Sequence, residues 1–223
     1  AWLHNGEYQD ARYVYAVATL PEYRGRGYAT RILTCAREHF REPLLLAPAE
    51  ESLIRFYEKM GFQRAFGQTR QTVTVDVAAQ ELGGEETVER KPVTAEDYVK
   101  LRDQSCEKEG YVRWDEAAVQ YAMDVNANAG GTTDIVIRKP EREGEKPAED
   151  QRDLLMYRPD GDVLEIVETT LDDAELRGML PRLFAETGTS RAVCGQMEGM
   201  IWMPEHMRDE PVRADGYLAL TLD

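Results

Sequence analysis

The loop Arg24-Gly25-Arg26-Gly27 combines residue types that could bind an anion, and a helical pattern begins directly after it. The first turn of a helix presents main-chain N–H groups without helical partners and carries partial positive charge. Glycine at position 27 lets the backbone approach a ligand that a Cβ would keep away, and the arginines add charge. The loop therefore predicts a site suited to a diphosphate. Taken alone, so short a motif is also compatible with a plain glycine turn carrying surface arginines.

The elements around this loop predict an alternation of strands and helices. Residues 11–19 are β-branched and aromatic, which predicts a buried strand ended by Pro21. Residues 28–40 predict a helix with one apolar stripe, formed by Ala29, Ile32, Leu33, Ala36 and Phe40. Further strands are predicted at 44–47, 62–65 and 72–77, with a helix at 51–60 that ends at Gly61. Asn5-Gly6 predicts a hairpin turn at the start of the chain.

A polar stretch with glycines and a proline predicts a linker over residues 83–92. Beyond it, helices are expected at 94–106, 115–127 and 172–187. Strands are expected at 133–138, 154–158, 163–168, 191–196 and 217–222, and a charged loop is expected at 139–152. Both parts of the chain then share a strand–helix–strand core, which indicates a weak internal repeat.

Two spaced motifs resemble the GNAT superfamily of N-acetyltransferases. That family's loop reads Gln/Arg-x-x-Gly-x-Gly/Ala, and residues 24–29 read Arg-Gly-Arg-Gly-Tyr-Ala. The run F-Y-E-K-M-G-F at 56–62 resembles the family's tyrosine-bearing helix with its Gly-Phe ending. The resemblance covers residues 11–78.

The resemblance implies acetyl-CoA as cosubstrate and a primary amine as acceptor in a ternary complex. It assigns CoA binding to Val17, Ala18, Thr19, Arg24, Gly25, Arg26, Gly27, Tyr28 and Ala29. The backbone of 17–19 would pair with the pantetheine arm, and Tyr57 would be the general acid that protonates the departing thiolate. Alternatively, Tyr57 is a core tyrosine. Strand 11–20 carries no glutamate, so no general base is named.

The resemblance also implies the fold class and the division of the chain. We expect an α/β (α+β) protein with a mixed, mostly antiparallel sheet flanked by helices, in two tandem GNAT-like domains. Residues 1–82 would be the C-terminal portion of a CoA-binding domain. Residues 93–223 would be a degenerate domain. Residues 169–175, at the place of the diphosphate loop, carry three carboxylates and contain neither glycine nor arginine. The family places further helices and strands before the loop, so truncation, another chain or residues 93–168 would have to account for them.

The net charge is −15, and it is unevenly distributed. Residues 1–83 contain ten basic and ten acidic residues, whereas residues 84–223 contain 17 and 32. Such a surface disfavours nucleic acid and anionic membranes and favours a cationic small-molecule acceptor, although solubility alone would also explain it. No apolar run is long enough to span a bilayer.

The cysteines and histidines predict no metal site, because none of them lies at ligand spacing from another. Three widely spaced cysteines indicate buried thiols in a reducing cytoplasm. The second part is expected to serve stability, homodimerisation or the acidic wall of the acceptor site. The methionine-rich stripe at 197–203 is expected to pack in the core, or else to form a soft ligand wall.

The sequence leaves three functions open. The first is an N-acetyltransferase that moves an acetyl group from acetyl-CoA to an amine. The second is a CoA-binding sensor or scaffold without turnover, favoured by the absence of an identified base. The third is a nucleotide-phosphate binder, which is disfavoured because the loop lacks the Gly-Lys-Ser/Thr of such sites.

Overall fold

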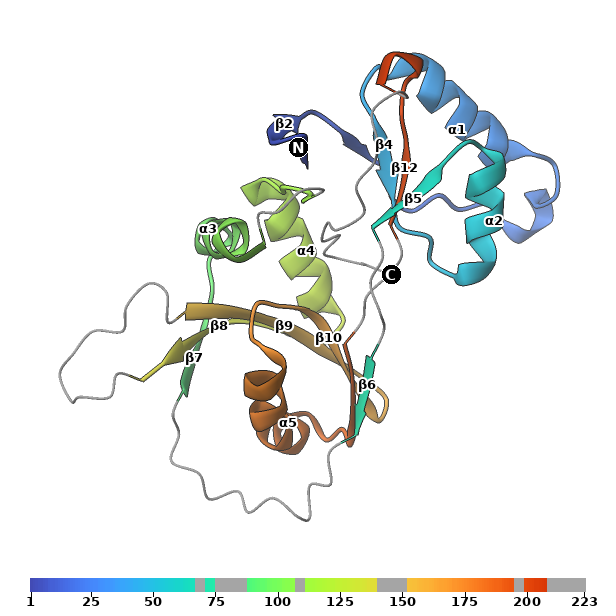
Figure 1. Ribbon diagram of the computed structural model, residues 1–223. Helices are drawn as coiled ribbons and strands as arrows, with labels where there is room; N and C mark the ends of the chain where they lie inside the picture. Colours follow the sequence, from blue (N-terminus) through green and yellow to red (C-terminus); the bar gives the residue numbers. More distant parts are fainter. Residues whose placement is uncertain (67–70, 75–87, 107–110, 140–151, 195–198, 208–223) are drawn as a thin grey trace.

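Two sheets and a separate hairpin organise the chain (Figure 1). The computed structural model describes residues 1–66, 71–74, 88–106, 111–139, 152–194 and 199–207. Helices flank both sheets, and most strand pairs are antiparallel. The predicted fold class, a mixed and mostly antiparallel α/β architecture, is confirmed.

The smaller sheet has four strands and carries the diphosphate-loop candidate. In spatial order the strands are β3 (Arg12–Tyr13), β4 (Leu44–Leu46), β12 (Gly199–Trp202) and β5 (Gln63–Phe66). β3 and β4 are parallel, and the other pairs are antiparallel. Helices α1 (Tyr28–His39) and α2 (Glu51–Lys59) follow β3 and β4 in sequence.

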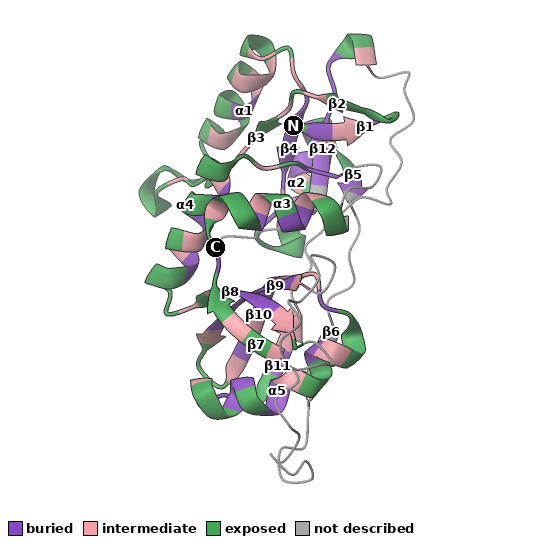
Figure 2. Cartoon of the chain, turned by 90° about the vertical axis from the view of Figure 1, so that its left-hand side faces the viewer, coloured by how far each residue is buried: buried purple, intermediate pink, exposed green. Residues whose placement is uncertain are grey.

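The two faces of this sheet have different partners. Because side chains alternate along a strand, Leu44 and Leu46 of β4 pack in one cluster with α1 and α2, together with Met200 and Trp202 of β12. Leu45 packs on the opposite face with Ile201, Trp2 and Val112. Figure 2 shows the buried residues of β4 and β12 at the centre of this half of the molecule.

The larger sheet has six strands. Their spatial order is β6 (Gln71–Thr74), β11 (Arg191–Cys194), β10 (Val163–Thr169), β9 (Arg152–Asp160), β8 (Thr132–Arg138) and β7 (Val88–Pro92). Helices α3 (Ala95–Cys106) and α4 (Glu116–Asn128) cover one face, and α5 (Asp173–Thr187) covers the other (Figure 1). The sheet is therefore the middle layer of three.

Strand–helix–strand units with parallel strands occur in both sheets. β3 and β4 are joined through α1, and β10 and β11 are joined through α5. The internal repeat expected from the sequence is thus present as a shared topology.

The two sheets exchange strands. β12 comes from the second part of the chain and lies between β4 and β5 of the smaller sheet, whereas β6 comes from the first part and pairs with β11. Both pairs are antiparallel: Phe66 of β5 is paired with Gly199 of β12, where the register shifts, and Gln71 of β6 is paired with Cys194 of β11. Each sheet therefore contains one strand from the other side of residue 82.

The hairpin at the start of the chain covers one face of the smaller sheet. Strands β1 (Trp2–His4) and β2 (Glu7–Gln9) are antiparallel, and Asn5 and Gly6 both have left-handed φ, 52° and 78°. The Leu3 N–H donates to the Tyr111 carbonyl at 2.8 Å, so the hairpin also joins the segment between α3 and α4. The hairpin prediction is confirmed.

Several predictions about the first part of the chain are wrong in detail. The strand expected over 11–19 is confined to Arg12–Tyr13 and is half-exposed, because β3 is an edge strand with β4 as its only described neighbour. Ile32, expected in the buried stripe of α1, has 59% of its surface exposed. Cys35 is exposed as well, so it is not a buried thiol.

The linker prediction over 83–92 is wrong for residues 88–92, which form β7. The sequence Val-Glu-Arg-Lys-Pro reads as polar, but an edge strand tolerates charge and a terminal proline. Val88 and Arg90 face inward and are half-buried. Residues 83–87, 140–151 and 217–222 lie outside the described residues, and with them the rest of the linker, the expected charged loop and the last expected strand.

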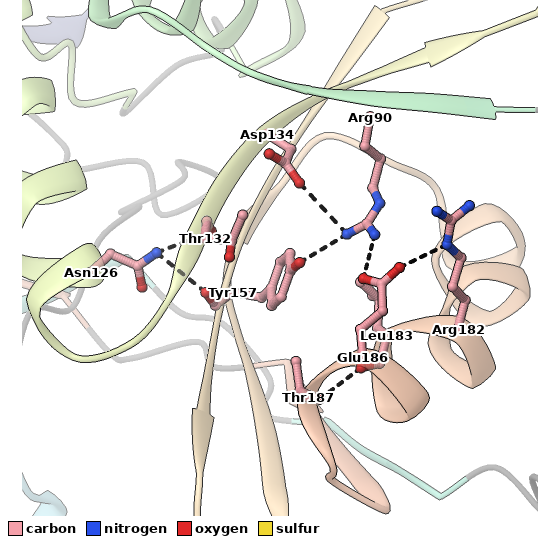
Figure 3. A network of polar contacts seen from close by, with 9 residues as sticks. All are labelled: Arg90, Asn126, Thr132, Asp134, Tyr157, Arg182, Leu183, Glu186 and Thr187. Atoms are coloured by element: carbon pink, nitrogen blue, oxygen red, sulfur yellow. Dashed lines mark hydrogen bonds and ion pairs between the residues drawn. The ribbon is translucent and has the colours of Figure 1, made fainter.

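Arg90 joins β7 to α5 through a network of hydrogen bonds and ion pairs (Figure 3). Its guanidinium donates to the Tyr157 hydroxyl at 2.8 Å and to Glu186 of α5, and it lies 3.6 Å from Asp134. Arg182 donates to the same glutamate at 2.8 Å. Burial raises the pKa of Asp134, and Arg90 opposes that shift. The inward-facing arginine thus explains why a polar segment forms a strand.

No helix among the described residues is long and apolar enough to cross a membrane.

Candidate functional site

The loop before α1 has an unusual backbone. Gly25 and Gly27 both have φ of 75°, in the left-handed region where a Cβ is disfavoured. Gly27 is the N-cap of α1, so the first N–H groups of that helix point toward the loop. No described atom lies within 4 Å of the position that a Cβ would take at either glycine. The backbone conformation therefore accounts for glycine here, and the space beside the loop is open.

The side chains of the loop lie on the outside of the molecule. Arg24 donates to the Thr19 carbonyl at 3.1 Å, which folds the loop back against the preceding segment. Arg26 lies over the ring of Tyr23, with 5.4 Å from its central carbon to the ring centroid. The rings of Tyr23 and Tyr28 meet edge to face at 6.2 Å. Two guanidinium groups are thus held around an exposed helix N-terminus.

The strand before the loop separates from its neighbour. The paired register of β3 and β4 ends at Tyr13, and the Val14 N–H still donates to the Leu45 carbonyl at 2.7 Å. Ala16 has a φ of 54°, which is rare for a residue other than glycine or asparagine. Residues 17–19 then run on without a strand partner in the described part of the chain, except that the Thr19 carbonyl accepts from Arg24. This opening leaves main-chain groups available for an added extended chain.

Tyr57 lies on α2 with its ring inside the core. It is 7% exposed and meets the rings of Phe56 and Phe62 at 5.2 and 5.7 Å. Burial raises the pKa of its phenol above the ordinary value of about 10. The hydroxyl has no hydrogen-bond partner among the described residues, so its proton is available as a donor.

The structure brings several predicted site residues together. Val14 and Val17 pack against the same cluster as Tyr57, and that cluster also contains Leu33 of α1. The segment that follows β3, the helix α1 and Tyr57 therefore share one core. Glu22 is exposed in the short helix η1 (Pro21–Tyr23), so it adds no buried base.

The break at Ala16 was not predicted from the sequence. A left-handed alanine carries no sequence signal, because left-handed positions are normally recognised by glycine, asparagine or aspartate.

In the second part of the chain, the residues at the start of α5 stand where the loop stands before α1, and their side chains bind other groups of the protein. Asp172 and Glu175 form a capping box at the start of α5, and Arg177 pairs with Asp173 at 2.7 Å. Arg138 bonds to Glu175 at 2.7 Å. These carboxylates stabilise the helix and disfavour a phosphate in the same place.

A buried ion pair joins the larger sheet to α3. Glu168 of β10 accepts from Arg102 at 2.8 Å and from the Tyr98 hydroxyl. Arg102 also donates to Tyr111 at 2.8 Å. Burial works against the charged form of Arg102, but Glu168, Tyr111 and Tyr98 together outweigh it and keep the pKa of Arg102 above its ordinary value. β10 and α3 are thus joined by side chains at a bulge of β10 after Ile166.

The family model described as acetyltransferase (GNAT) domain matches residues 1–64. The comparison with curated proteins returned no match.

Solved structures with the same fold include a conserved protein from Enterococcus faecalis, described as a probable N-acyltransferase. It is 17% identical, with 89% of this chain and 55% of that one covered and a TM-score of 0.57. Eis1 from Mycobacterium abscessus is 12% identical, with 91% and 58% covered and a TM-score of 0.56. A GCN5-related N-acetyltransferase from Kribbella flavida is 16% identical, with 86% and 51% covered and a TM-score of 0.49. The chain spans a little over half the length of each of these three solved structures.

Proposed function

We propose that this chain, whose residues 1–64 match the GNAT acetyltransferase family model, moves an acetyl group from acetyl-CoA to a primary amine. The left-handed glycine pair at the start of α1 is the observation that carries this proposal. It presents helix N–H groups and two arginines to open space, an arrangement that suits a diphosphate.

The segment after Val14 fits the pantetheine arm. Because residues 17–19 have left β4, their main-chain groups can pair with an extended ligand as a strand would. The Val17 side chain packs into the core and holds the segment in place. The thioester would then lie close to the break at Ala16, where a main-chain N–H can polarise its carbonyl.

Tyr57 supplies the proton that the leaving thiolate needs. Its raised pKa keeps the phenol protonated at neutral pH, so it can donate as the amine displaces the thiolate. The acetyl group passes directly to the neutral amine in a ternary complex. The amine then loses a proton to solvent, and Tyr57 regains one from solvent, so the phenol is restored. The acidic excess of residues 84–223 favours a cationic acceptor.

Substitution of Gly27 tests the proposal. Gly27→Asp places a negative charge beside the diphosphate, whereas Gly27→Asn has nearly the same shape, tolerates left-handed φ and adds no charge. In calorimetry with acetyl-CoA, we expect the aspartate variant to lose about tenfold or more in affinity relative to the asparagine variant. Equal affinity of the glycine and aspartate proteins would rule out the loop as the diphosphate site.

The second candidate function is CoA binding without turnover, which the lack of a base in strand 11–20 favours. Thiol release from acetyl-CoA with a panel of amines separates the two functions. Tight binding without thiol release for any amine would favour the sensor.

A further inference from the structure

We propose that Tyr15 and Tyr121 are specificity-determining residues that hold the amine acceptor by their ring faces. Tyr15 lies in the strand segment before the loop, and Tyr121 lies on α4 in the second part of the chain. The inference rests on the proposed function, because it takes the thioester to lie near Ala16. It also gives the second part a direct role in the acetyl-transfer site.

The position of Tyr15 follows from the alternation of side chains along the strand. Val14 packs in the cluster that contains Tyr57, and Tyr13 packs on the opposite face of the sheet. Tyr15 points to the same side as Tyr13, with their rings stacked at 6.5 Å, and it immediately precedes the left-handed Ala16. Its ring therefore stands at the place where the strand leaves β4.

Tyr121 brings a second ring to the same place. The rings of Tyr15 and Tyr121 meet edge to face at 6.2 Å, although the residues come from different parts of the chain. Tyr13 makes a similar contact with Trp114, 5.6 Å between centroids, just before α4 begins. Two independent aromatic contacts thus fix α4 against this strand.

Both tyrosines remain open to solvent in spite of this contact. Tyr15 is 42% exposed and Tyr121 is 51% exposed. Aromatic rings that meet only to stabilise a fold normally bury most of their surface. Two half-exposed rings at the place where the strand leaves β4 instead offer a surface on which a small molecule can pack.

The chemistry of this surface fits a positively charged acceptor. Ring faces attract ammonium groups. Asp124 lies three residues after Tyr121 on α4, is exposed and accepts a hydrogen bond from Gln120 at 2.8 Å, so this part of the helix surface carries a negative charge. The carboxylate and both rings therefore favour the same charge in a ligand.

The test uses the full chain, with spermidine as the acceptor and acetyl-CoA as the donor. We expect Tyr121→Ala and Tyr15→Ala to raise the KM for spermidine about fivefold or more, because each removes a ring face. Tyr121→Phe keeps the ring and should leave that KM within about twofold of the parent value. The KM for acetyl-CoA should remain the same in all variants, and thermal melts report whether each variant is folded.

Tyr8→Ala provides a matched control, because Tyr8 is also a half-exposed tyrosine, 37% exposed, but lies on β2. We expect it to leave the KM for spermidine unchanged. This inference alone would be overturned if Tyr15→Ala and Tyr121→Ala turned over spermidine with an unaltered KM. It would also be overturned if Tyr121→Phe raised that KM as much as Tyr121→Ala does. Failure of the parent protein to release thiol with spermidine, benzylamine and lysine would overturn the proposed function and this inference with it.

Discussion

Ala16 has the least expected backbone conformation of the candidate site. A left-handed conformation costs an alanine roughly 1–2 kcal/mol, so the surrounding structure must hold it there. It lies between Val14, which still bonds to β4, and Val17, which packs in the core. The strain is therefore located at the point where the strand opens toward the proposed pantetheine arm.

Tyr57→Phe should lower kcat about a hundredfold, because it removes the proton donor and keeps the ring in the core. The affinity for acetyl-CoA should not change, which calorimetry can verify. A variant that keeps kcat within about threefold would exclude Tyr57 as the acid.

The pH dependence of kcat should reflect the raised pKa of Tyr57. The phenol stays protonated until the pH exceeds a value above about 10, so loss of the acid cannot lower kcat between pH 7 and 9.5. We expect kcat to rise or stay level over that range as the amine loses its proton. A decline below about pH 9 that disappears in Tyr57→Phe would contradict the raised pKa.

At the scale of elements, single side chains decide which segments become strands. β7 is polar in sequence, yet Arg90 gives it partners on β8, β9 and α5. Its alternation of half-buried and exposed residues is that of an edge strand. The order of this segment therefore depends on tertiary contacts.

Arg90→Met should destabilise the protein by about 3 kcal/mol, because the mostly buried Asp134 loses its cation and Glu186 keeps only Arg182. The control Arg182→Met removes an exposed contact within α5 and should cost about 0.5 kcal/mol or less. Urea unfolding measures both.

The cost of Arg90→Met should also depend on pH. Burial already raises the pKa of Asp134, and loss of Arg90 raises it further. A carboxyl group with a raised folded-state pKa loses stability as pH rises through that pKa, so the variant should lose more stability at pH 7.5 than at pH 5. A cost that is equal at both pH values would contradict the assignment of these contacts.

At the scale of the whole molecule, the exchange of strands makes the two sheets mutually dependent. β12 lies between β4 and β5 and supplies Met200 and Trp202 to the core that contains Tyr57. The Trp202 ring also lies under the guanidinium of Arg37, 4.9 Å away. The candidate acetyl-transfer site is therefore completed by the second part of the chain.

A fragment of residues 1–82 should not fold by itself, because it lacks β12 and leaves Leu44, Leu46 and Tyr57 without their packing partners. We expect no cooperative thermal transition and no acetyl-CoA binding, whereas the full chain should show both. A fragment with native-like circular dichroism and acetyl-CoA affinity would show that the exchange is dispensable.

The charge of the whole molecule predicts a salt effect. If the acidic excess steers a cationic acceptor, kcat/KM for spermidine should fall as NaCl rises from about 0.05 to 0.5 M, since exposed charges are screened. The effect should be shallower for benzylamine, which carries less charge. Equal slopes for the two amines would remove the case for steering.

The sequence by itself determined the features that depend on neighbouring residues. The glycine loop before α1, the hairpin at Asn5-Gly6 and the boundaries of α1 and α2 follow from local backbone preferences and apolar periodicity. Only the tertiary structure decided that β6 and β12 change sheets, that residues 88–92 form a strand and that Ala16 adopts a left-handed conformation. These features depend on partners far away in the chain, and strand pairing over such distances leaves no periodic signal in either strand alone.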